Sequence, residues 1–424
     1  MNFMKLAKVS FVFIAAALLT FALSGAAFAF HSGGVAQCES CHTMHNSVNG
    51  VRTQATNTWN QNILGLQVGM AGPSLVQASD RSSVCLNCHG VADTTANGYH
   101  IMSLGQAIPT ERTPGGDFAW LSQGGTQGPR KGHSIIAADF GFTTADPTKT
   151  LGVSPGGNYP TNQLFCVSCH DPHGTYRKLP GFSGTFARSG APIATSGSYG
   201  ADPSAGANTA VGAYRLLGGK NWQPSFITNA SLAFASDPMN AASPSSYNRS
   251  EAASDTLVAY GKGVSEWCAN CHQAMLTSTS TVANGHVHPN AQALSSGLVA
   301  NYNSYVKTGD STGTQGYTSL VPIQNDNLIV NSQLATALTS TTIQGTAQVM
   351  CLTCHRAHAG GFNAMLRWPT AQNMTSLVGG VVVYPTAGLD GISQAAVQAA
   401  LYDRPATAFA ANQRPLCNKC HMKD

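Results

Sequence analysis

A single pentapeptide, Cys-x-x-Cys-His, recurs six times and uses every cysteine of the chain. The copies span Cys38–His42, Cys85–His89, Cys166–His170, Cys268–His272, Cys351–His355 and Cys417–His421. The pattern is typical of c-type haem attachment, because two thiols add to the haem vinyl groups and the adjacent histidine reaches the iron. A redox dithiol or a four-cysteine zinc site would need no histidine at that position. The sequence therefore predicts six haems, held by Cys38, Cys41, Cys85, Cys88, Cys166, Cys169, Cys268, Cys271, Cys351, Cys354, Cys417 and Cys420.

The N-terminus predicts a secretory signal peptide over residues 1–29. Lys5 and Lys8 precede an apolar run from Val9 to Leu23, and Ala27-Phe28-Ala29 matches a cleavage site. The run is too short, with the wrong flanks, for a transmembrane helix. We therefore expect an exported mature chain, which agrees with haem attachment outside the cytoplasm.

Composition bounds the fold of the mature chain. Charged residues are only 9 %, against about 25 % in ordinary soluble domains, and the motifs are spread over the whole length. We expect one domain over residues 30–424, mostly irregular coil with few short α-helices and minor β structure, wrapped around a continuous stack of six haems. Two segments without helical or strand periodicity, 183–208 and 277–346, could be linkers or disorder. We favour the alternative, in which packing on porphyrin faces orders them.

A few segments predict regular structure. Ser393–Tyr402 has a serine N-cap, good helix formers and a stop at Arg404-Pro405. Val264–Met275 could be a short helix that carries the fourth motif. Val381–Tyr384, after two glycines, is a strand candidate.

The histidines are numerous enough to supply both axial ligands of every iron. The chain has 14, and the six in the motifs are predicted as proximal ligands: His42, His89, His170, His272, His355 and His421. Eight remain as candidates for the distal position: His31, His45, His100, His133, His173, His286, His288 and His358. Six irons with two histidines each would leave two of the eight unused.

Three of these candidates, His45, His173 and His358, each lie three residues after a motif histidine. Residues i and i+3 leave the same face of a helical turn, whereas the two axial ligands of one iron approach from opposite porphyrin faces. Each of the three is therefore expected to ligate a haem other than its neighbour's, unless it is a solvent-exposed histidine. Such sharing would force neighbouring haems into close packing.

Iron with two histidine ligands has no open coordination site, so it suits electron transfer rather than catalysis. A multihaem reductase for nitrite, sulfite or hydroxylamine would need one open haem, often marked by an altered motif, and all six motifs keep their histidine. Charge argues against a nucleic-acid partner. The formal net charge of +4 becomes negative, about −4, once the signal peptide is removed and six ferric haems add about −1 each.

Several stretches carry a resemblance to a known family: Phe30–Asn46, Thr113–Trp120, Arg130–His133, Gln163–Gly174, Val211–Gly219, Val258–His272, Cys351–His358 and Leu416–Asp424. Through them the chain resembles the OmcS-type hexahaem outer-surface cytochromes of metal-reducing bacteria, which polymerise into extracellular cytochrome nanowires. The resemblance covers nearly the whole mature chain, while the loops between these stretches diverge.

The resemblance implies a secreted, cell-surface filament of head-to-tail protomers. We expect it to carry electrons to extracellular acceptors such as iron(III) oxides or partner cells, with other multihaem cytochromes as partners. It implies that His45 ligates the haem of His355 in the neighbouring protomer. It further implies a distal set of His31, His45, His100, His133, His173, His288 and His358, seven candidates for six irons, with the spare one undetermined. His286 has no recognised counterpart. The alternative function is a soluble periplasmic multihaem electron carrier.

Overall fold

The structure is a computed structural model that describes residues 38–42, 47–48, 51–52, 75–91, 100–104, 115–122, 130–142, 151–244, 258–277, 290, 292–314, 316–386, 393–402 and 404–422. The predicted signal peptide lies outside these ranges and stays a prediction. Among the helices in these ranges, none has the length and apolar character needed to cross a bilayer.

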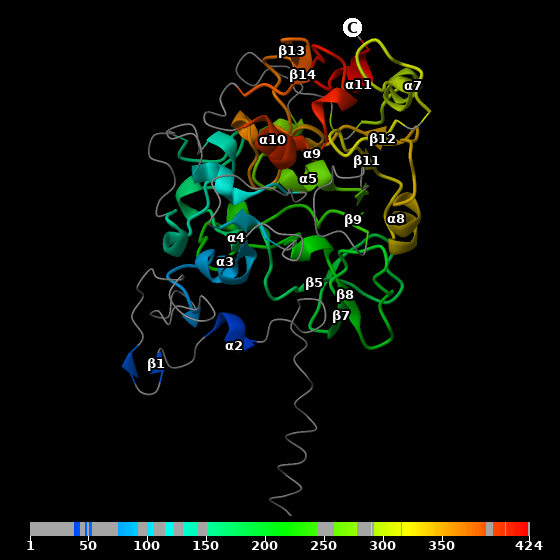
Figure 1. Cartoon of the computed structure of the whole chain (residues 1–424). Helices are drawn as coiled ribbons and strands as arrows, with labels where there is room; N and C mark the ends of the chain where they lie inside the picture. The colour runs from blue at the N-terminus through cyan, green and yellow to red at the C-terminus, as the bar shows by residue number, and fades with distance from the viewer. Residues whose placement is uncertain are drawn as a thin grey trace, which may run out of the picture.

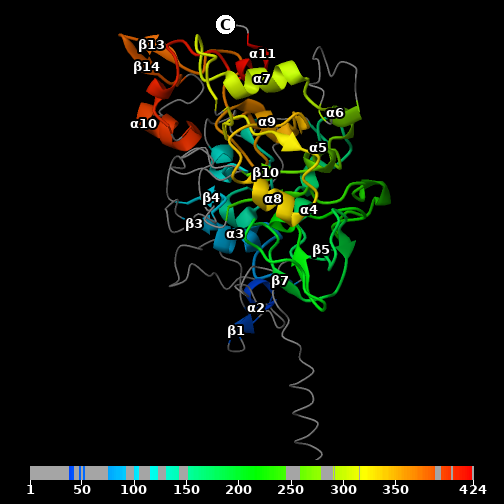
Figure 2. The same cartoon turned by 90° about the vertical axis from the view of Figure 1, so that its right-hand side faces the viewer.

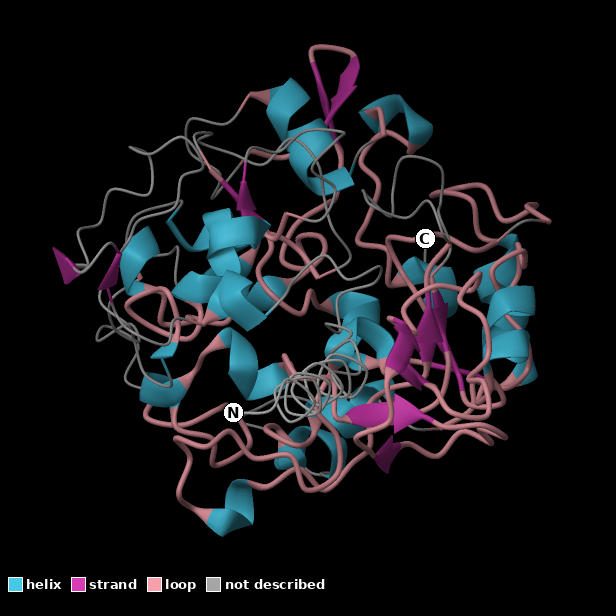
Figure 3. Cartoon of the chain, turned by 90° about the horizontal axis from the view of Figure 1, so that it is seen from below, coloured by secondary structure: helices cyan, strands magenta, loops and turns pink. Residues whose placement is uncertain are grey.

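Loops make up most of the described chain, and Figure 3 shows them joining short helices and strands. The α-helices are α2 (Cys38–Cys41), α3 (Ser83–His89), α4 (Cys166–Cys169), α5 (Val264–Cys268), α6 (Gln273–Thr277), α7 (Ser296–Ser304), α8 (Asn331–Ala337), α9 (Cys351–Cys354), α10 (Gln394–Val397) and α11 (Asn418–His421). Short 3-10 helices lie between them, for example Phe118–Ser122, Ala138–Phe140 and Thr161–Gln163. The predicted fold class, mostly coil with few short helices and minor β structure, is confirmed.

The strands are two or three residues long: β1 (Ser47–Val48), β2 (Val51–Arg52), β3 (Gly90–Val91), β4 (Met102–Ser103), β5 (Tyr176–Lys178), β6 (Ala187–Arg188), β7 (Ile193–Thr195), β8 (Ala210–Gly212), β9 (Ala241–Ala242), β10 (Ala259–Tyr260), β11 (Gln324–Asn325), β12 (Ala347–Gln348), β13 (Ser376–Val378) and β14 (Val381–Val383). There are two small four-stranded sheets among the described residues. The sheet in the order β6-β5-β8-β7 is local, within residues 176–212, whereas the sheet in the order β12-β11-β10-β9 joins segments spread over residues 241–348. Each mixes parallel and antiparallel pairs.

The chain runs from one end of the molecule to the other. In Figures 1 and 2, α2 and β1 lie at one end, whereas α7, α11 and the β13–β14 hairpin lie at the opposite end. The helices of the second to fifth motifs lie between these ends. The order of the motifs in the sequence is therefore roughly their order along the molecule.

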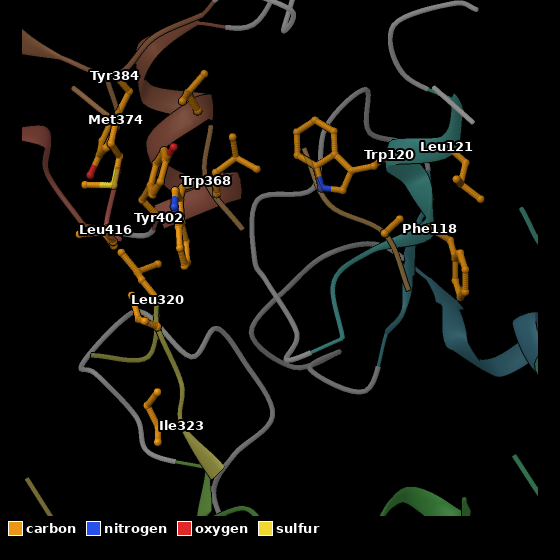
Figure 4. Close-up of a cluster of buried hydrophobic side chains, with 14 of the residues drawn as sticks. Phe118, Trp120, Leu121, Leu320, Ile323, Trp368, Met374, Tyr384, Tyr402 and Leu416 are labelled. Atoms are coloured by element: carbon orange, nitrogen blue, oxygen red, sulfur yellow. The ribbon is translucent and has the colours of Figure 1, made fainter. Parts of the chain in front are cut away.

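An apolar cluster that extends from Leu86 of α3 to Leu416 beside the sixth motif gives the polypeptide a core of its own. It includes Trp120 and Trp368, which are 2 % and 3 % exposed, together with the fully buried Tyr402. Figure 4 shows Tyr384 and Tyr402 beside Trp368, with Trp120 in a separate group. The rings of Tyr384 and Tyr402 stack at 4.2 Å between centroids. The sequence analysis, which placed the core in a haem stack, did not foresee this cluster.

Two of the predicted elements are confirmed. The helix predicted over Ser393–Tyr402 is α10 followed by a π turn over Gln398–Tyr402, with the Ser393 side chain accepting the Ala396 N–H. The predicted strand at Val381–Tyr384 is β14, paired with β13.

One other expectation is wrong in detail. The helix expected over Val264–Met275 is divided into α5 and α6, because the turn Ala269–His272 interrupts it. Segments 183–208 and 277–346, which have no helical or strand periodicity, contain short elements: β6 and β7 in the first, and α7, β11 and α8 in the second. This order agrees with the favoured alternative to linkers or disorder, whereas packing on porphyrin faces stays a prediction. Long-range contacts stabilise these elements, since the Tyr302 hydroxyl of α7 donates to the Val321 carbonyl at 2.6 Å.

Candidate haem-binding sites

Each Cys-x-x-Cys-His motif forms one helical turn. In five motifs the histidine N–H donates to the carbonyl of the first motif cysteine, at 2.9 Å in the first and 3.0–3.1 Å in the third to sixth. In the second motif, α3 includes both cysteines and His89. Residues at i, i+3 and i+4 share one face of such a turn. Two thiols and an imidazole on one face are the arrangement that two thioether bonds and an axial ligand to the same haem require.

Backbone carbonyls orient three of the motif histidines through the Nδ1 atom. The ring of His170 lies 2.8 Å from the Arg215 carbonyl, and that of His355 lies 2.7 Å from the Ala364 carbonyl. His272 makes the same contact with Pro155, at 2.8 Å. Because a carbonyl only accepts, Nδ1 must carry the proton, so Nε2 keeps its lone pair. That tautomer is the one that ligates a metal through Nε2.

The first, third and fifth motifs share a further feature, a later segment that pairs with the motif. We call it the return segment, and it contains Val76-Gln77, Leu217-Gly218 or Leu366-Arg367. His42, His170 and His355 form isolated antiparallel bridges with one residue of their return segment, which is Val76, Leu217 or Leu366. The next residue of each return segment donates its backbone N–H to the backbone carbonyl of the second motif cysteine, at 2.8–2.9 Å. These donors are Gln77, Gly218 and Arg367.

The return segments also share a left-handed backbone. The residue before each bridged residue has a positive φ although none of the three is glycine: 59° at Leu75, 53° at Leu216 and 58° at Met365. The residues that bind the Nδ1 atoms of His170 and His355, Arg215 and Ala364, have φ values of 52° and 56°. The odd-numbered motifs are therefore three copies of one local structure.

The structure brings histidine rings together in pairs. The centroid distance is 6.3 Å between His42 and His173, 6.2 Å between His170 and His358, and 6.1 Å between His272 and His133. An imidazole nitrogen lies about 2 Å from a metal that it ligates, so one metal between two opposed rings separates their centroids by about 6 Å. The residues present therefore fit an iron at each of these three positions.

In each pair one ring belongs to a motif and the other does not. His173 follows the third motif but faces the histidine of the first, and His358 follows the fifth motif but faces that of the third. Neither lies opposite the motif histidine three residues before it. This is the arrangement that the spacing of three residues led us to expect.

Burial favours the neutral form of His133 and His358, the members of two pairs that lie outside the motifs. Desolvation lowers the pKa of His133 to about 4 and that of His358 to about 3. Desolvation also lowers the pKa of the proximal His170. The Nδ1 atom of His133 lies 2.7 Å from the Ala357 carbonyl. A neutral imidazole with Nδ1 protonated is the form that binds a metal.

Adjacent motifs contact each other in a repeated way. The Ser82 hydroxyl, three residues before the second motif, accepts the Cys166 N–H of the third motif at 3.0 Å. The Ser265 hydroxyl, three residues before the fourth motif, accepts the Cys351 N–H of the fifth at 3.2 Å. The side chains of Cys85 and Cys166 are also close enough to raise the pKa of the Cys85 thiol, and Cys351 acts in the same way on the pKa of Cys268. The second and third motifs are therefore packed together as the fourth and fifth are.

His100 differs from the paired histidines. It is fully buried, and its Nε2 atom lies 3.4 Å from the Asp117 carboxylate. That carboxylate also accepts the Ser103 hydroxyl at 2.6 Å and the Ala119 N–H at 2.7 Å. Four of the predicted candidates lie outside the described residues: His31, His45, His286 and His288. Among the described residues, His355 has no second histidine ring stacked or tilted against its own.

Sequence reasoning missed the groups that position the motifs. The carbonyls of Pro155, Arg215 and Ala364 could not be found from sequence, because any residue type supplies a carbonyl. The two serines left a signal, since Ser82 and Ser265 hold the same position three residues before a first motif cysteine.

Comparison with known proteins identifies close relatives. No family model matches the chain. The chain is 45 % identical, over 98 % of its own length and 99 % of the relative's, to the C-type cytochrome OmcS of Geobacter sulfurreducens. Two solved structures of that bacterium's proteins are similar: OmcS nanowires, with a TM-score of 0.77 and 40 % identity, and the Outer Membrane Cytochrome S filament, with 0.76 and 41 %. Each match covers 93 % of this chain and 100 % of the solved one. The chain therefore belongs to the OmcS family of multihaem c-type cytochromes.

Proposed function

We propose that this chain carries six covalent c-type haems, each with two histidine ligands, and polymerises head to tail into an extracellular filament that conducts electrons. The single observation that carries the proposal is the pairing of histidine rings across the motifs. The relatives, described as nanowires and as a filament, support the polymer.

The pairing advances by two motifs at each step. The histidine that follows the third motif faces the first motif, and the one that follows the fifth faces the third. The next step would need a histidine three residues after a seventh motif, facing His355. A single chain has no seventh motif, but the first motif of the next protomer would take its place. His45 of that protomer is then the distal ligand at His355.

We assign the even-numbered motifs to a second series with the same step, built on the one described pair that involves them. His133 precedes the third motif and faces the fourth. Shifted back by two motifs, this series assigns His31 to the haem of His89. Shifted forward by two motifs, the series assigns a histidine that precedes the fifth motif to the haem of His421. We assign His288 to this position; His286 lies two residues before it in the sequence.

Together the two series supply six distal ligands: His31, His45, His133, His173, His288 and His358. His100 belongs to neither series, and its Nε2 atom lies 3.4 Å from the Asp117 carboxylate. On this assignment His100 is the spare member of the predicted set of seven.

Six haems with filled coordination spheres favour electron transfer over catalysis. The motif residues hold each haem and its iron, the return segments orient the proximal rings, and contacts between neighbouring motifs keep successive haems close. The haems themselves carry the electrons. Iron(III) oxides and other multihaem cytochromes are the acceptors that we propose for a conduit on the cell surface.

The alternative function, a soluble periplasmic carrier, would leave the haem of His355 with a ligand from its own chain. Replacement of His45 by alanine separates the two functions. We expect the variant to keep six haems, because the thioethers do not depend on His45, while one haem becomes high-spin and the filaments are lost. Electron paramagnetic resonance and negative-stain microscopy of material sheared from cells measure both effects.

The matched control is His286→Ala, which should leave haem spin state and filaments unchanged. Long filaments with six low-spin haems in the His45→Ala variant would contradict ligation across protomers. Wild-type protein that stays monomeric at the cell surface would favour the soluble carrier.

A further inference from the structure

The β13–β14 hairpin presents an apolar surface to solvent. Its strands pair Ser376 with Val383 and Val378 with Val381, joined by Gly379-Gly380. Both glycines have positive φ, 58° and 81°, which a two-residue hairpin loop of the primed type requires.

The side chains of this hairpin are unusual for a solvent-exposed element. Leu377 is 49 % exposed, Val378 61 % and Val381 58 %, and the segment Ser376–Val383 contains no charged residue. Soluble proteins normally protect such strands with charged side chains or proline. A two-stranded hairpin is also marginally stable without further packing. An exposed apolar surface of this kind typically marks a protein interface.

Hydrogen bonds fix the hairpin beside the sixth motif. The Leu377 N–H donates to the Asn412 side chain at 3.1 Å, and the Met374 N–H donates to the Gln413 carbonyl at 2.8 Å. The Gln413 side chain in turn accepts the Thr308 N–H at 2.8 Å. This last contact brings the loop after α7 to the same place.

That loop and the C-terminal turn also expose apolar side chains. Val306 is 47 % exposed and Met422 is 38 % exposed. Lys419 of the sixth motif donates to the Tyr305 carbonyl at 2.8 Å, which ties Val306 to the motif. We call the five side chains the C-terminal apolar patch: Val306, Leu377, Val378, Val381 and Met422. They are most of the large apolar side chains exposed in the described residues, and Figures 1 and 2 place their elements at the end opposite α2.

The opposite end carries an exposed apolar side chain beside the first motif. Leu75, in the return segment of that motif, is 52 % exposed. The two ends of the chain of motifs thus both expose apolar side chains, one at the sixth motif and one at the first.

We propose that the C-terminal apolar patch is the surface on which a second copy of this chain docks, through the end that carries its first motif and Leu75. The proposal rests on the head-to-tail polymer and names the segment that builds it. Because the two docking surfaces differ, the contact is heterologous and does not close, so it grows as a fibre. The β13–β14 hairpin then contacts the next copy beside the sixth motif, and burial of its exposed valines in that contact stabilises the assembly.

The test uses the full-length, haem-loaded protein with Val378→Asp and Val381→Asp combined. Both side chains are exposed, so the monomer should fold and keep its wild-type haem content. All its haems should be low-spin except the haem of His355, which lacks the distal ligand that a neighbouring protomer would supply. We expect this variant to form no filaments by negative-stain microscopy and to elute as a monomer. Its first-motif end remains intact, so a minor fraction mixed with wild-type protein should cap growing filaments and shorten them.

The matched control is Val153→Asp, a valine that is 44 % exposed beside the fourth motif, which should leave filament length unchanged. A milder pair, Val378→Thr and Val381→Thr, keeps side-chain shape and should still lengthen the lag before filaments appear. Wild-type-like filaments from the aspartate variant would overturn the patch while leaving the polymer intact. Absence of filaments from the wild-type protein would instead overturn the proposed function.

Discussion

Two residues hold motif histidines through carbonyls in a strained backbone. Arg215 and Ala364 have φ values of 52° and 56°, and their carbonyls bind the Nδ1 atoms of His170 and His355. The left-handed conformation costs about 1–2 kcal/mol for a residue with a side chain. The strain is thus located where the orientation of a proximal ring is fixed, which is typical of functional sites.

This strain can be tested at Ala364, whose side chain is exposed. Ala364→Gly should raise the thermal midpoint, because relief of the strain, up to about 1 kcal/mol net, exceeds the added entropy of the unfolded chain. Ala335→Gly, inside α8, is the matched control. It should lower the thermal midpoint, because glycine inside a helix costs about 1 kcal/mol of folding free energy relative to alanine. Thermal unfolding followed by circular dichroism measures both, and an equal loss in the two variants would show that Ala364 is not strained.

At the scale of elements, a buried carboxylate organises the turn that leads into α3. Asp80 is 7 % exposed and accepts the N–H groups of Ser82 and Ser83, at 2.8 and 2.9 Å. Its second oxygen accepts the Ser83 hydroxyl at 2.7 Å and the Ala138 N–H at 2.6 Å. Asp80 therefore positions Ser82, the residue that contacts the third motif.

Asp80→Ala should destabilise the protein by about 3 kcal/mol, because several buried donors lose a charged acceptor. It should also loosen the contact between the second and third motifs. Asp310 is the control, since its carboxylate makes similar local bonds to Thr312, but these bonds are exposed to solvent. Asp310→Ala should leave the thermal midpoint unchanged. If Asp80→Ala unfolds at the wild-type temperature, Asp80 does not organise the motif pair.

The sequence was most informative where a pattern is local. The helix at Ser393–Tyr402 and the strand at Val381–Tyr384 follow from a serine cap and from a run of valines after two glycines, and both are present. By contrast, α7 was not foreseen, although Ser295 caps it. Its one buried residue, Tyr302, depends on contacts with Val321 and Lys419, which no local pattern reveals.

The candidate site divides in the same way. The cysteines and proximal histidines are visible because haem chemistry fixes their spacing. The spacing of three residues also predicts that His173 and His358 ligate haems of other motifs, and their rings face His42 and His170. Which motif each one faces depends on how the chain folds back between motifs, so only the structure supplies the step of two. The placement of His100 at Asp117 likewise depends on a contact that local spacing does not determine.

At the scale of the whole molecule, the polypeptide and the haems are expected to fold together. Replacement of Cys166 and Cys169 by alanine would remove the third haem, which lies between contacts to the second motif and to His358. We expect limited proteolysis to cut this variant over long stretches rather than only near residue 166. The control is a variant of the exposed thiol Cys38 in the terminal first motif. A wild-type digestion pattern for the central variant would contradict folding around haem.

The central claim is that the chain of haems continues from one protomer to the next through His45. A cryo-electron microscopy map of wild-type filaments tests it most directly, at the iron held by His355. We predict six haems per protomer and, on the distal side of that iron, an imidazole that traces to His45 of the neighbouring protomer. A distal ligand from the same protomer, or an open position at that iron, would contradict the account.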